Sequence, residues 1–378
     1  MGKTYGVGLL GAGVISETYL KLASLFGNIE IRAIADIIPE AAARRASEFG
    51  IRAQTPEQML KDSEIDVIVN LTVPEVHYRT SSDIVSAGKH VYSEKPLVLT
   101  LEEGQSLRSA AAHYGVQVGC APDTFLGGAN QQARALIDSG AIGPIASGTC
   151  HQMGIGMDHW HPNPHFFYRP GGGPEHDIGP YYLSSLVNLI GPIRRVTALA
   201  ATPRRQRNIP VGPRAGEVIE VATPTTIHAV MEFHSGAVVT LGLSRDVEAN
   251  QHANIELYGL DGSLYLPNPI FFGGEIVLAR RDDTRDSLGA ENYPFGMPNW
   301  GKDSSRKFAN YRTVGLADMM RAVSEGRAPR CSLDLALHQV EVMKAILTSA
   351  ERGEAVAITT TCERPEALGF EEARSLLA

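Results

Sequence analysis

The strongest constraint in this sequence is an apolar stretch near its N-terminus that runs directly into a glycine-rich turn. Residues 5–10 predict a short buried strand, and Gly11 and Gly13 follow it at the spacing of a dinucleotide-binding turn. In such a turn the first glycine permits a tight bend and the second lets the backbone approach a pyrophosphate, which faces the N-terminus of the next helix. The third position of the motif holds Ser16 in place of Gly or Ala, so the residues that follow decide the prediction.

Those residues continue the pattern of a dinucleotide-binding fold. An amphipathic helix, with Ile15 and Tyr19 on its apolar face, leads to a strand over residues 29–35 that ends in Asp36. A carboxylate at this place accepts hydrogen bonds from both hydroxyls of an adenosine ribose and repels a 2′-phosphate. We therefore expect NAD as the cofactor, in preference to NADP.

Strands and helices alternate as far as residue 120, which predicts a parallel sheet. The nearly continuous apolar run over residues 65–71 is typical of a fully buried strand, and its following loop lies at the sheet edge where such folds bind ligands. His77 in this loop could either contact the cofactor or cap the next helix. The residues that we expect to bind the cofactor are Gly11, Gly13, Val14, Ile15, Asp36, Thr72, Pro74, His77, Glu94 and Lys95.

The alternation changes near residue 123, where long strands joined by short turns replace it. We expect strands over residues 145–153, 193–201, 225–233, 237–245 and 254–258, with one helix over residues 177–189 between them. The fold class is therefore α/β, with a Rossmann parallel-sheet domain over residues 1–123 and a substrate-binding and oligomerisation domain over residues 124–378. This second domain is expected to hold an open, mostly antiparallel sheet.

Two further features of the second region bear on assembly and on access to a site. Apolar residues alternate along 225–233, so one sheet face should pack on helices and the other should be semi-apolar. A free face of this kind often dimerises, and we expect a homodimer or homotetramer. Residues 282–312 show little periodicity and predict a long ordered loop over the sheet or a lid on a cleft.

Length and charge limit the classes of function. A chain of 378 residues exceeds the usual single core, and a net charge of -8 without a basic cluster argues against binding to nucleic acid or to an anionic membrane. No apolar run approaches the roughly 20 residues of a membrane span, and the early first strand leaves no room for a signal peptide, so we expect a cytoplasmic protein. The 4 cysteines form no Cys-x-x-Cys pair and are interpreted as reduced structural thiols.

Three motifs in order identify a family resemblance. These are Gly11-Ala12-Gly13, Glu94-Lys95-Pro96 and Asp177-Ile178-Gly179-Pro180-Tyr181. With them the sequence resembles the Gfo/Idh/MocA family of sugar and cyclitol dehydrogenases over nearly its whole length. The resemblance implies an N-terminal Rossmann domain, a C-terminal α/β domain with an open antiparallel sheet, and a nicotinamide positioned near Lys95.

The resemblance assigns catalytic roles to Lys95, Asp177 and Tyr181. Lys95 follows the end of a strand, where a cation can stabilise the negative charge that develops on the alcohol oxygen as its proton departs during hydride transfer. Tyr181 is the expected proton-transfer residue. Many family members have histidine there, whereas tyrosine occurs in the glucose-fructose oxidoreductase and dihydrodiol dehydrogenase branches. Asp177 lies four residues earlier, on the same face of the expected helix, and would position the substrate hydroxyl and Lys95.

A loop rich in aromatic and hydrogen-bonding residues, 158–169, is the candidate substrate segment. A polyol needs several donors and acceptors and a flat apolar surface, which these side chains can supply. Three histidines in the loop also raise the possibility of a metal, but hydride transfer to NAD needs none and no ligand helix occurs, so we expect no metal. The residues that we expect to contact the substrate are Lys95, Asp123, Trp160, His161, Asn163, His165, Arg169, His176, Asp177 and Tyr181.

Three functions remain open on these residues. The leading hypothesis is a dehydrogenase that transfers a hydride between NAD and a ring hydroxyl or keto carbon of a sugar, sugar derivative or cyclitol. The alternatives are an NAD-dependent glycosidase or lyase that uses transient oxidation, and a non-catalytic NAD-binding regulatory protein. The complete set of Lys95, Asp177 and Tyr181 favours an enzyme, because a regulatory protein has no need of proton-transfer groups.

Overall fold

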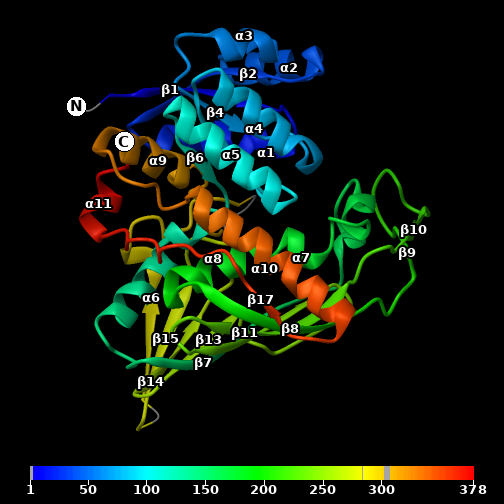
Figure 1. Cartoon of the computed structure of the whole chain (residues 1–378), viewed down its shortest axis with the longest axis vertical. Coiled ribbons are helices and arrows are strands. Elements are labelled where there is room, and N and C mark those ends of the chain that lie inside the picture. Colours follow the sequence, from blue (N-terminus) through cyan, green and yellow to red (C-terminus); the bar gives the residue numbers. More distant parts are fainter. Residues whose placement is uncertain (1–2, 283, 302–306) are drawn as a thin grey trace. The chain divides into compact units, whose positions relative to one another are not determined.

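The chain forms two compact units, which we describe from a computed structural model of residues 3–282, 284–301 and 307–378 (Figure 1). The first unit contains residues up to 127 together with 309–340 and 365–378, and the second contains 128–308 and 341–364. We expected a single boundary at residue 123 with everything beyond it in the second domain. The chain instead crosses near residue 127 and later returns twice to the first unit.

The first unit contains a six-stranded parallel sheet in the order β3-β2-β1-β4-β5-β6. This is the strand order of a Rossmann fold, as the alternating pattern predicts. Its strands are β1 (Tyr5–Leu10), β2 (Ile29–Ala35), β3 (Arg52–Gln54), β4 (Val67–Asn70), β5 (His90–Ser93) and β6 (Val118–Cys120). Its N-terminal helices are α1 (Val14–Leu22), α2 (Pro39–Phe49), α3 (Pro56–Lys61), α4 (His77–Ser86) and α5 (Leu101–Tyr114), with 3₁₀ turns η1 (Ala23–Leu25), η2 (Pro74–Val76) and η3 (Thr124–Leu126).

Local signals account for the ends of these helices. Pro39 begins α2, where a missing N–H costs nothing, and Gly50 ends it in the left-handed conformation with φ 69°. Thr100 and Glu103 form a reciprocal capping box at the start of α5. Such signals are contained within a few residues, which is why the sequence predicts them well.

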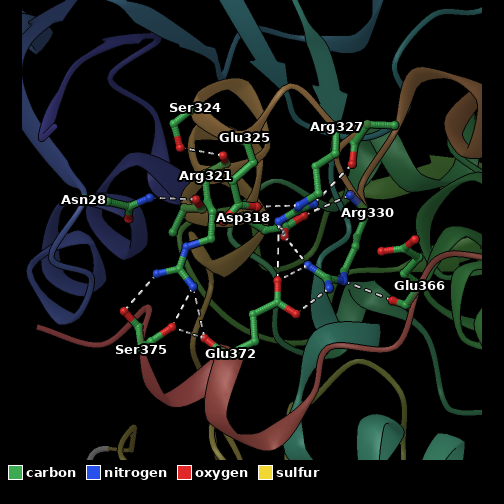
Figure 2. Close-up of polar contacts among 12 residues, drawn as sticks. Asn28, Asp318, Arg321, Ser324, Glu325, Arg327, Arg330, Glu366, Glu372 and Ser375 are labelled. Atoms are coloured by element: carbon green, nitrogen blue, oxygen red, sulfur yellow. Dashed lines mark hydrogen bonds and ion pairs between the residues drawn. The ribbon is translucent and has the colours of Figure 1, made fainter. Parts of the chain in front are cut away.

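Buried ion pairs join the two C-terminal segments of the first unit to each other (Figure 2). The carboxylate of Asp318 in α9 (Val314–Glu325) is fully buried and accepts a hydrogen bond from Arg327 at 2.8 Å and others from Arg330. Arg330 also donates to Glu372 of α11 (Phe370–Arg374) at 2.7 Å. Buried charges are stable only when paired, so these contacts hold the last residues of the chain against α9.

The second unit contains a nine-stranded sheet in the order β16-β15-β14-β13-β7-β12-β11-β8-β17. All neighbours are antiparallel except β7 and β12, so the sheet is mixed and mostly antiparallel, as expected. The strands are β7 (Ile145–Met153), β8 (Ile193–Ala201), β11 (Thr226–Phe233), β12 (Val238–Ser244), β13 (Ile255–Gly259), β14 (Gly262–Leu266), β15 (Glu275–Arg280), β16 (Arg285–Gly289) and β17 (Val356–Ala357). Strands β9 (Gln206–Asn208) and β10 (Val218–Glu220) form a separate hairpin.

The two faces of this nine-stranded sheet differ in burial. Along β11, Ile227, Ala229 and Met231 are at most 3% exposed, whereas Val230 is 45% exposed. The expected division into a packed face and an open semi-apolar face is therefore confirmed. The helices of this unit are α6 (Gly128–Asp138), α7 (Pro174–Asp177), α8 (Gly179–Ile190) and the C-terminal part of α10 (Leu333–Arg352), whose first residues belong to the other unit.

Two predicted elements differ from the structure. The helix expected over residues 177–189 is found as α8, which begins only at Gly179, and a short helix, α7, precedes it and ends at Asp177. Ile178 separates the two, because Pro180 has no N–H to donate to the carbonyl oxygen of His176. The loop expected over 282–312 contains the exposed edge strand β16 and a 3₁₀ turn, η6 (Ala290–Asn292), while residues 283 and 302–306 lie outside the described ranges.

All four cysteines are buried thiols, in agreement with the prediction. Within the described ranges, every helix is too short or too polar to cross a membrane.

Candidate active site

The glycine turn after β1 forms one wall of a groove in the first unit. Gly11 has φ 118°, and a Cβ there would lie 2.6 Å from the carbonyl oxygen of Leu71, so only glycine fits. Gly13 has an ordinary φ of -70°, and a Cβ at Gly13 would meet nothing within 4 Å. Its backbone therefore faces open space at the N-terminus of α1, which is where a pyrophosphate would bind.

The groove itself has a volume of about 480 Å³ and is lined by Gly11, Gly13, Asp36 and Thr72 among the predicted cofactor residues. Sequence reasoning missed its apolar wall, formed by Ile37, Ile38, Val73 and Val76, which are all exposed. The two isoleucines directly after Asp36 are the sequence signal from which this wall could have been predicted. Such a surface suits a flat heterocycle such as adenine.

Asp36 is fixed at the end of β2 by two backbone donors. Its Oδ2 accepts a hydrogen bond from the N–H of Ala12 at 2.7 Å, and its Oδ1 accepts one from Ile38 at 2.9 Å. An ionised carboxylate has about four acceptor positions, so capacity for ribose hydroxyls remains.

His77 joins the two loops on which the cofactor residues lie. It is 1% exposed, and its Nε2 and Nδ1 lie 3.0 Å from the carbonyl oxygen of Thr72 and 2.6 Å from that of Pro96. The ring therefore links the loop after β4 to the loop that carries Lys95. These contacts support a structural role for His77. They support neither of the two roles considered from the sequence, a helix cap and a cofactor contact.

Glu94 and Lys95 follow β5, and both are half-buried. A carboxylate oxygen of Glu94 accepts a hydrogen bond from the hydroxyl of Tyr19 at 3.0 Å, which ties this loop to α1. Val14, at the start of α1, is 83% exposed and Ile15 is half-buried. Pro74 begins η2.

Asp123, one of the residues expected to contact the substrate, is buried. It is 1% exposed, and its Oδ2 accepts hydrogen bonds from the backbone N–H groups of Thr313 and Gly315, at 3.0 Å each. These donors are at the N-terminus of α9, where a carboxylate is favoured. The contacts support a structural role, which the sequence could not show because α9 lies far along the chain.

Asp177 and Tyr181 belong to the second unit. Asp177 ends α7, Ile178 interrupts the helix, and Tyr181 lies in the first turn of α8. The expectation of one continuous helix is therefore wrong: Asp177 and Tyr181 lie on two helices, although they are only four residues apart. Lys95 belongs to the first unit.

Two arginines that sequence reasoning missed hold the segment before Asp177. Arg207 donates to the buried Asp158 at 3.0 Å, and Arg245 donates to Asp177 at 3.0 Å. The hydroxyl of Tyr168 also donates to Asp158, and burial together with this bond raises the pKa of Tyr168 to about 12. Arg245 directly follows β12, and a charged residue at the end of a core strand is a sequence signal from which it could have been predicted. The sequence around Arg207 holds no such signal.

The predicted substrate residues occupy several environments. Trp160 is 65% exposed and contacts the edge of His161 at a centroid distance of 5.4 Å. Asn163 accepts a hydrogen bond from Arg214 at 2.7 Å, and His165 lies 3.1 Å from Glu217. Asn163 and His165 thus bind residues of the loop between β9 and β10. Trp160 and His161 form the aromatic surface of this segment.

Two further predicted residues flank the glycines before Asp177. Arg169 is exposed, and His176 pairs through Nδ1 with Glu175 at 2.8 Å. Gly172 between them is needed by the fold, since a Cβ there would lie 2.0 Å from the carbonyl oxygen of Phe166. Among the described residues, no group of three or more His, Cys, Asp or Glu side chains could hold a metal ion.

The chain is similar to known proteins over both units. Residues 5–121 match the family model described as "Oxidoreductase family, NAD-binding Rossmann fold", and residues 130–265 match the "GFO/IDH/MocA C-terminal domain". Levoglucosan dehydrogenase of Pseudarthrobacter phenanthrenivorans is 24% identical over 354 residues, which cover 85% of this chain and 89% of that protein.

Solved structures share the fold over nearly the whole chain. The NAD-binding oxidoreductase from Klebsiella pneumoniae has a TM-score of 0.80 at 24% identity and covers 94% of this chain and 99% of its own. Levoglucosan dehydrogenase in complex with NADH and levoglucosan has a TM-score of 0.78 at 22% identity, with 95% and 100% covered.

Proposed function

This chain belongs to the Gfo/Idh/MocA family of oxidoreductases, and on that premise we propose that it oxidises a ring hydroxyl of a sugar, sugar derivative or cyclitol with NAD. One observation carries the proposal: the dinucleotide groove with Gly11, Gly13 and Asp36 occurs in the same chain as Lys95, Asp177 and Tyr181. Such substrates are also those of the relatives named levoglucosan dehydrogenase and inositol 2-dehydrogenase.

The residues of this chain divide the proposed reaction between them. NAD, when bound, supplies the acceptor for the hydride. The phenolate form of Tyr181 accepts the proton of the substrate hydroxyl, directly or through water, and the ammonium of Lys95 stabilises the negative charge that develops on the same oxygen. Asp177 accepts a hydrogen bond from the substrate and fixes its orientation.

The preference for NAD over NADP follows from the end of β2. Asp36 would repel a 2′-phosphate, and the next two side chains, Ile37 and Ile38, offer no positive charge to compensate.

We also propose a homodimer or homotetramer that assembles through the open face of the nine-stranded sheet. The support is the exposed apolar side chains on that face, of which Leu199 is 74% and Val230 45% exposed. A cytoplasmic location is proposed as well, since all four cysteines are buried thiols that need no oxidising compartment.

A panel assay tests the proposed activity. Purified protein is mixed with NAD or NADP and with monosaccharides, anhydrosugars and inositols, and absorbance of the reduced nicotinamide is recorded. We expect reduction of NAD with at least one class of polyol and a slower reaction with NADP. Cleavage of glycosides without net NADH formation would instead establish the glycosidase alternative, and equal rates with both cofactors would contradict the role of Asp36.

The proton-transfer role predicts a large effect of one hydroxyl group. Tyr181→Phe should lower kcat on the order of a hundredfold or more, while NADH binding changes little, because the cofactor groove lies in the other unit. Lys95→Met, which keeps bulk but removes charge, should do at least as much harm. A kcat for Tyr181→Phe within about threefold of the unmodified enzyme would transfer the role to another group, with His176 the first to test.

A further inference from the structure

Arg245 is a buried cation that contacts a predicted catalytic residue and has no part in the function proposed above. It directly follows β12, and its side chain is 4% exposed. Its Nη2 donates to Oδ2 of Asp177 at 3.0 Å. Its Nη1 donates to the carbonyl oxygen of Gly172 at 2.9 Å and also to that of Phe167. One guanidinium therefore holds a carboxylate and two carbonyls of the preceding segment.

Aromatic and acidic neighbours complete the environment of this guanidinium. Its central carbon lies 5.2 Å from the ring centroid of Phe167 and 5.8 Å from that of Tyr168. Burial lowers the pKa of Arg245, and the carboxylates of Asp177 and Glu175 oppose that shift. A planar fork with fixed donors holds a carboxylate in one orientation better than a flexible ammonium could.

The backbone of Arg245 is itself fixed by a second buried arginine. Arg207 donates to the carbonyl oxygen of Arg245 at 2.5 Å and to the carboxylate of Asp246 at 2.5 Å. It also donates to the carbonyl oxygen of Ile155 and to Asp158. Arg207 thus holds the start of the candidate substrate segment, and Arg245 holds its end next to Asp177.

We propose that Arg245 is a positioning residue, which orients the carboxylate of Asp177 toward the substrate hydroxyl and fixes the substrate segment 158–169 relative to it. The proposal rests on the proposed function, in which Asp177 contacts the substrate. It adds a specificity element, because movement of the segment that carries Trp160 and His161 would be transmitted to Asp177 through Arg245. Residue 245 then couples recognition of the sugar to the alignment of its reacting hydroxyl.

A double-mutant cycle on kcat tests this proposal. The variants are Arg245→Met, Asp177→Asn and the two combined, with NADH affinity measured separately by fluorescence titration. If Arg245 acts through Asp177, Arg245→Met should lower kcat more than tenfold and leave the NADH Kd within about twofold. The double variant should have the kcat of Asp177→Asn within about threefold, because the carboxylate through which Arg245 acts is already lost.

A matched surface variant controls for loss of an arginine. Arg204 lies in the same unit, is 48% exposed and pairs with Glu248 at 3.5 Å, so Arg204→Met should keep kcat within about twofold. Arg245→Lys, which retains the charge without the fork, should recover part of the lost activity. If Arg245→Met fails to fold, the same cycle is carried out with Arg245→Lys, which measures the same coupling between residues 245 and 177.

Three results would contradict either the positioning role of Arg245 or the role of Asp177 in the proposed function. Full kcat in the folded Arg245 variant, or effects of the two substitutions that multiply in the double variant, would show that Arg245 does not act through Asp177. Full activity of Asp177→Asn would instead refute the role of Asp177 in the proposed function, and with it the premise of this inference.

Discussion

At the scale of single residues, burial gives Asp123 an unusual titration. Loss of hydration raises its pKa to about 6, although the backbone N–H groups of Gly315 and Thr313 partly oppose the shift. Among the described residues, its Oδ1 has no hydrogen-bond partner, so little compensates for the buried charge. The folded state therefore holds this proton more tightly than the unfolded chain, whose aspartates titrate near about 3.9.

This difference predicts how stability depends on pH. Between pH of about 4 and 6 the unfolded chain has lost the proton while the folded protein keeps it, so the contribution of Asp123 to stability falls as pH rises. The free energy of unfolding of the wild type, relative to Asp123→Asn, should fall by about 3 kcal/mol across this range. Urea unfolding of both proteins at several pH values measures it. Parallel pH profiles of the two proteins would contradict the buried, protonated state.

At the scale of elements, the turn between β1 and α1 separates a structural glycine from a functional one. Gly11→Ala should destabilise the protein, because the new Cβ would press on the backbone of Leu71 in a left-handed conformation. Gly13→Ala should leave the Tm of the ligand-free protein nearly unchanged, since the Cβ would meet open space.

Gly13→Ala should affect cofactor binding, although it leaves the stability of the ligand-free protein nearly unchanged. The Cβ of Gly13→Ala would occupy space that the pyrophosphate needs, so we expect NADH affinity to fall at least tenfold. Thermal unfolding with and without NADH, together with a fluorescence titration, measures both effects. Undiminished NADH affinity of Gly13→Ala would place the pyrophosphate elsewhere.

The paired helices α7 and α8 show what sequence periodicity can miss. A spacing of four residues predicts that Asp177 and Tyr181 share a helical face, but Pro180 ends that regularity and places them on different helices. The proline was visible in the sequence. The direction of each side chain on either side of the break depends on packing, and Asp177 is held by its contact with Arg245.

At the scale of the whole molecule, the open face of the nine-stranded sheet predicts the mode of assembly. Leu199 pairs with His228 across β8 and β11, and Val230 lies two residues further along β11 on the same face. Leu199→Glu combined with Val230→Glu should shift a dimer or tetramer toward monomer, because buried carboxylates would oppose each other across the interface.

Light scattering at micromolar concentrations gives the mass of each variant. Leu260→Glu is the matched control, since Leu260 is 63% exposed in the turn between β13 and β14 and not on that face. A strictly monomeric unmodified protein would disprove assembly through the sheet, and an equal effect of the control would show that the interface is elsewhere.

The sequence by itself determined the local architecture of this protein and the identity of its motifs. The positions of Gly11, Asp36 and the strand between them were predictable, because interactions within a few residues and the apolar periodicity of each element fix them. Lys95 and Tyr181 could also be named from the sequence, because a motif is recognised from the order of its residues and does not require their geometry.

Only the tertiary structure decided which distant residues meet. Asp123 caps a helix that begins near residue 314, Arg330 ties Asp318 to Glu372, and Arg245 orients Asp177. Each of these contacts joins residues from separate elements, and buried polar contacts of this kind have no sequence period. Their partners are set by strand order and by the requirement that buried polar groups find hydrogen-bond or charge partners, which is a property of the folded chain as a whole.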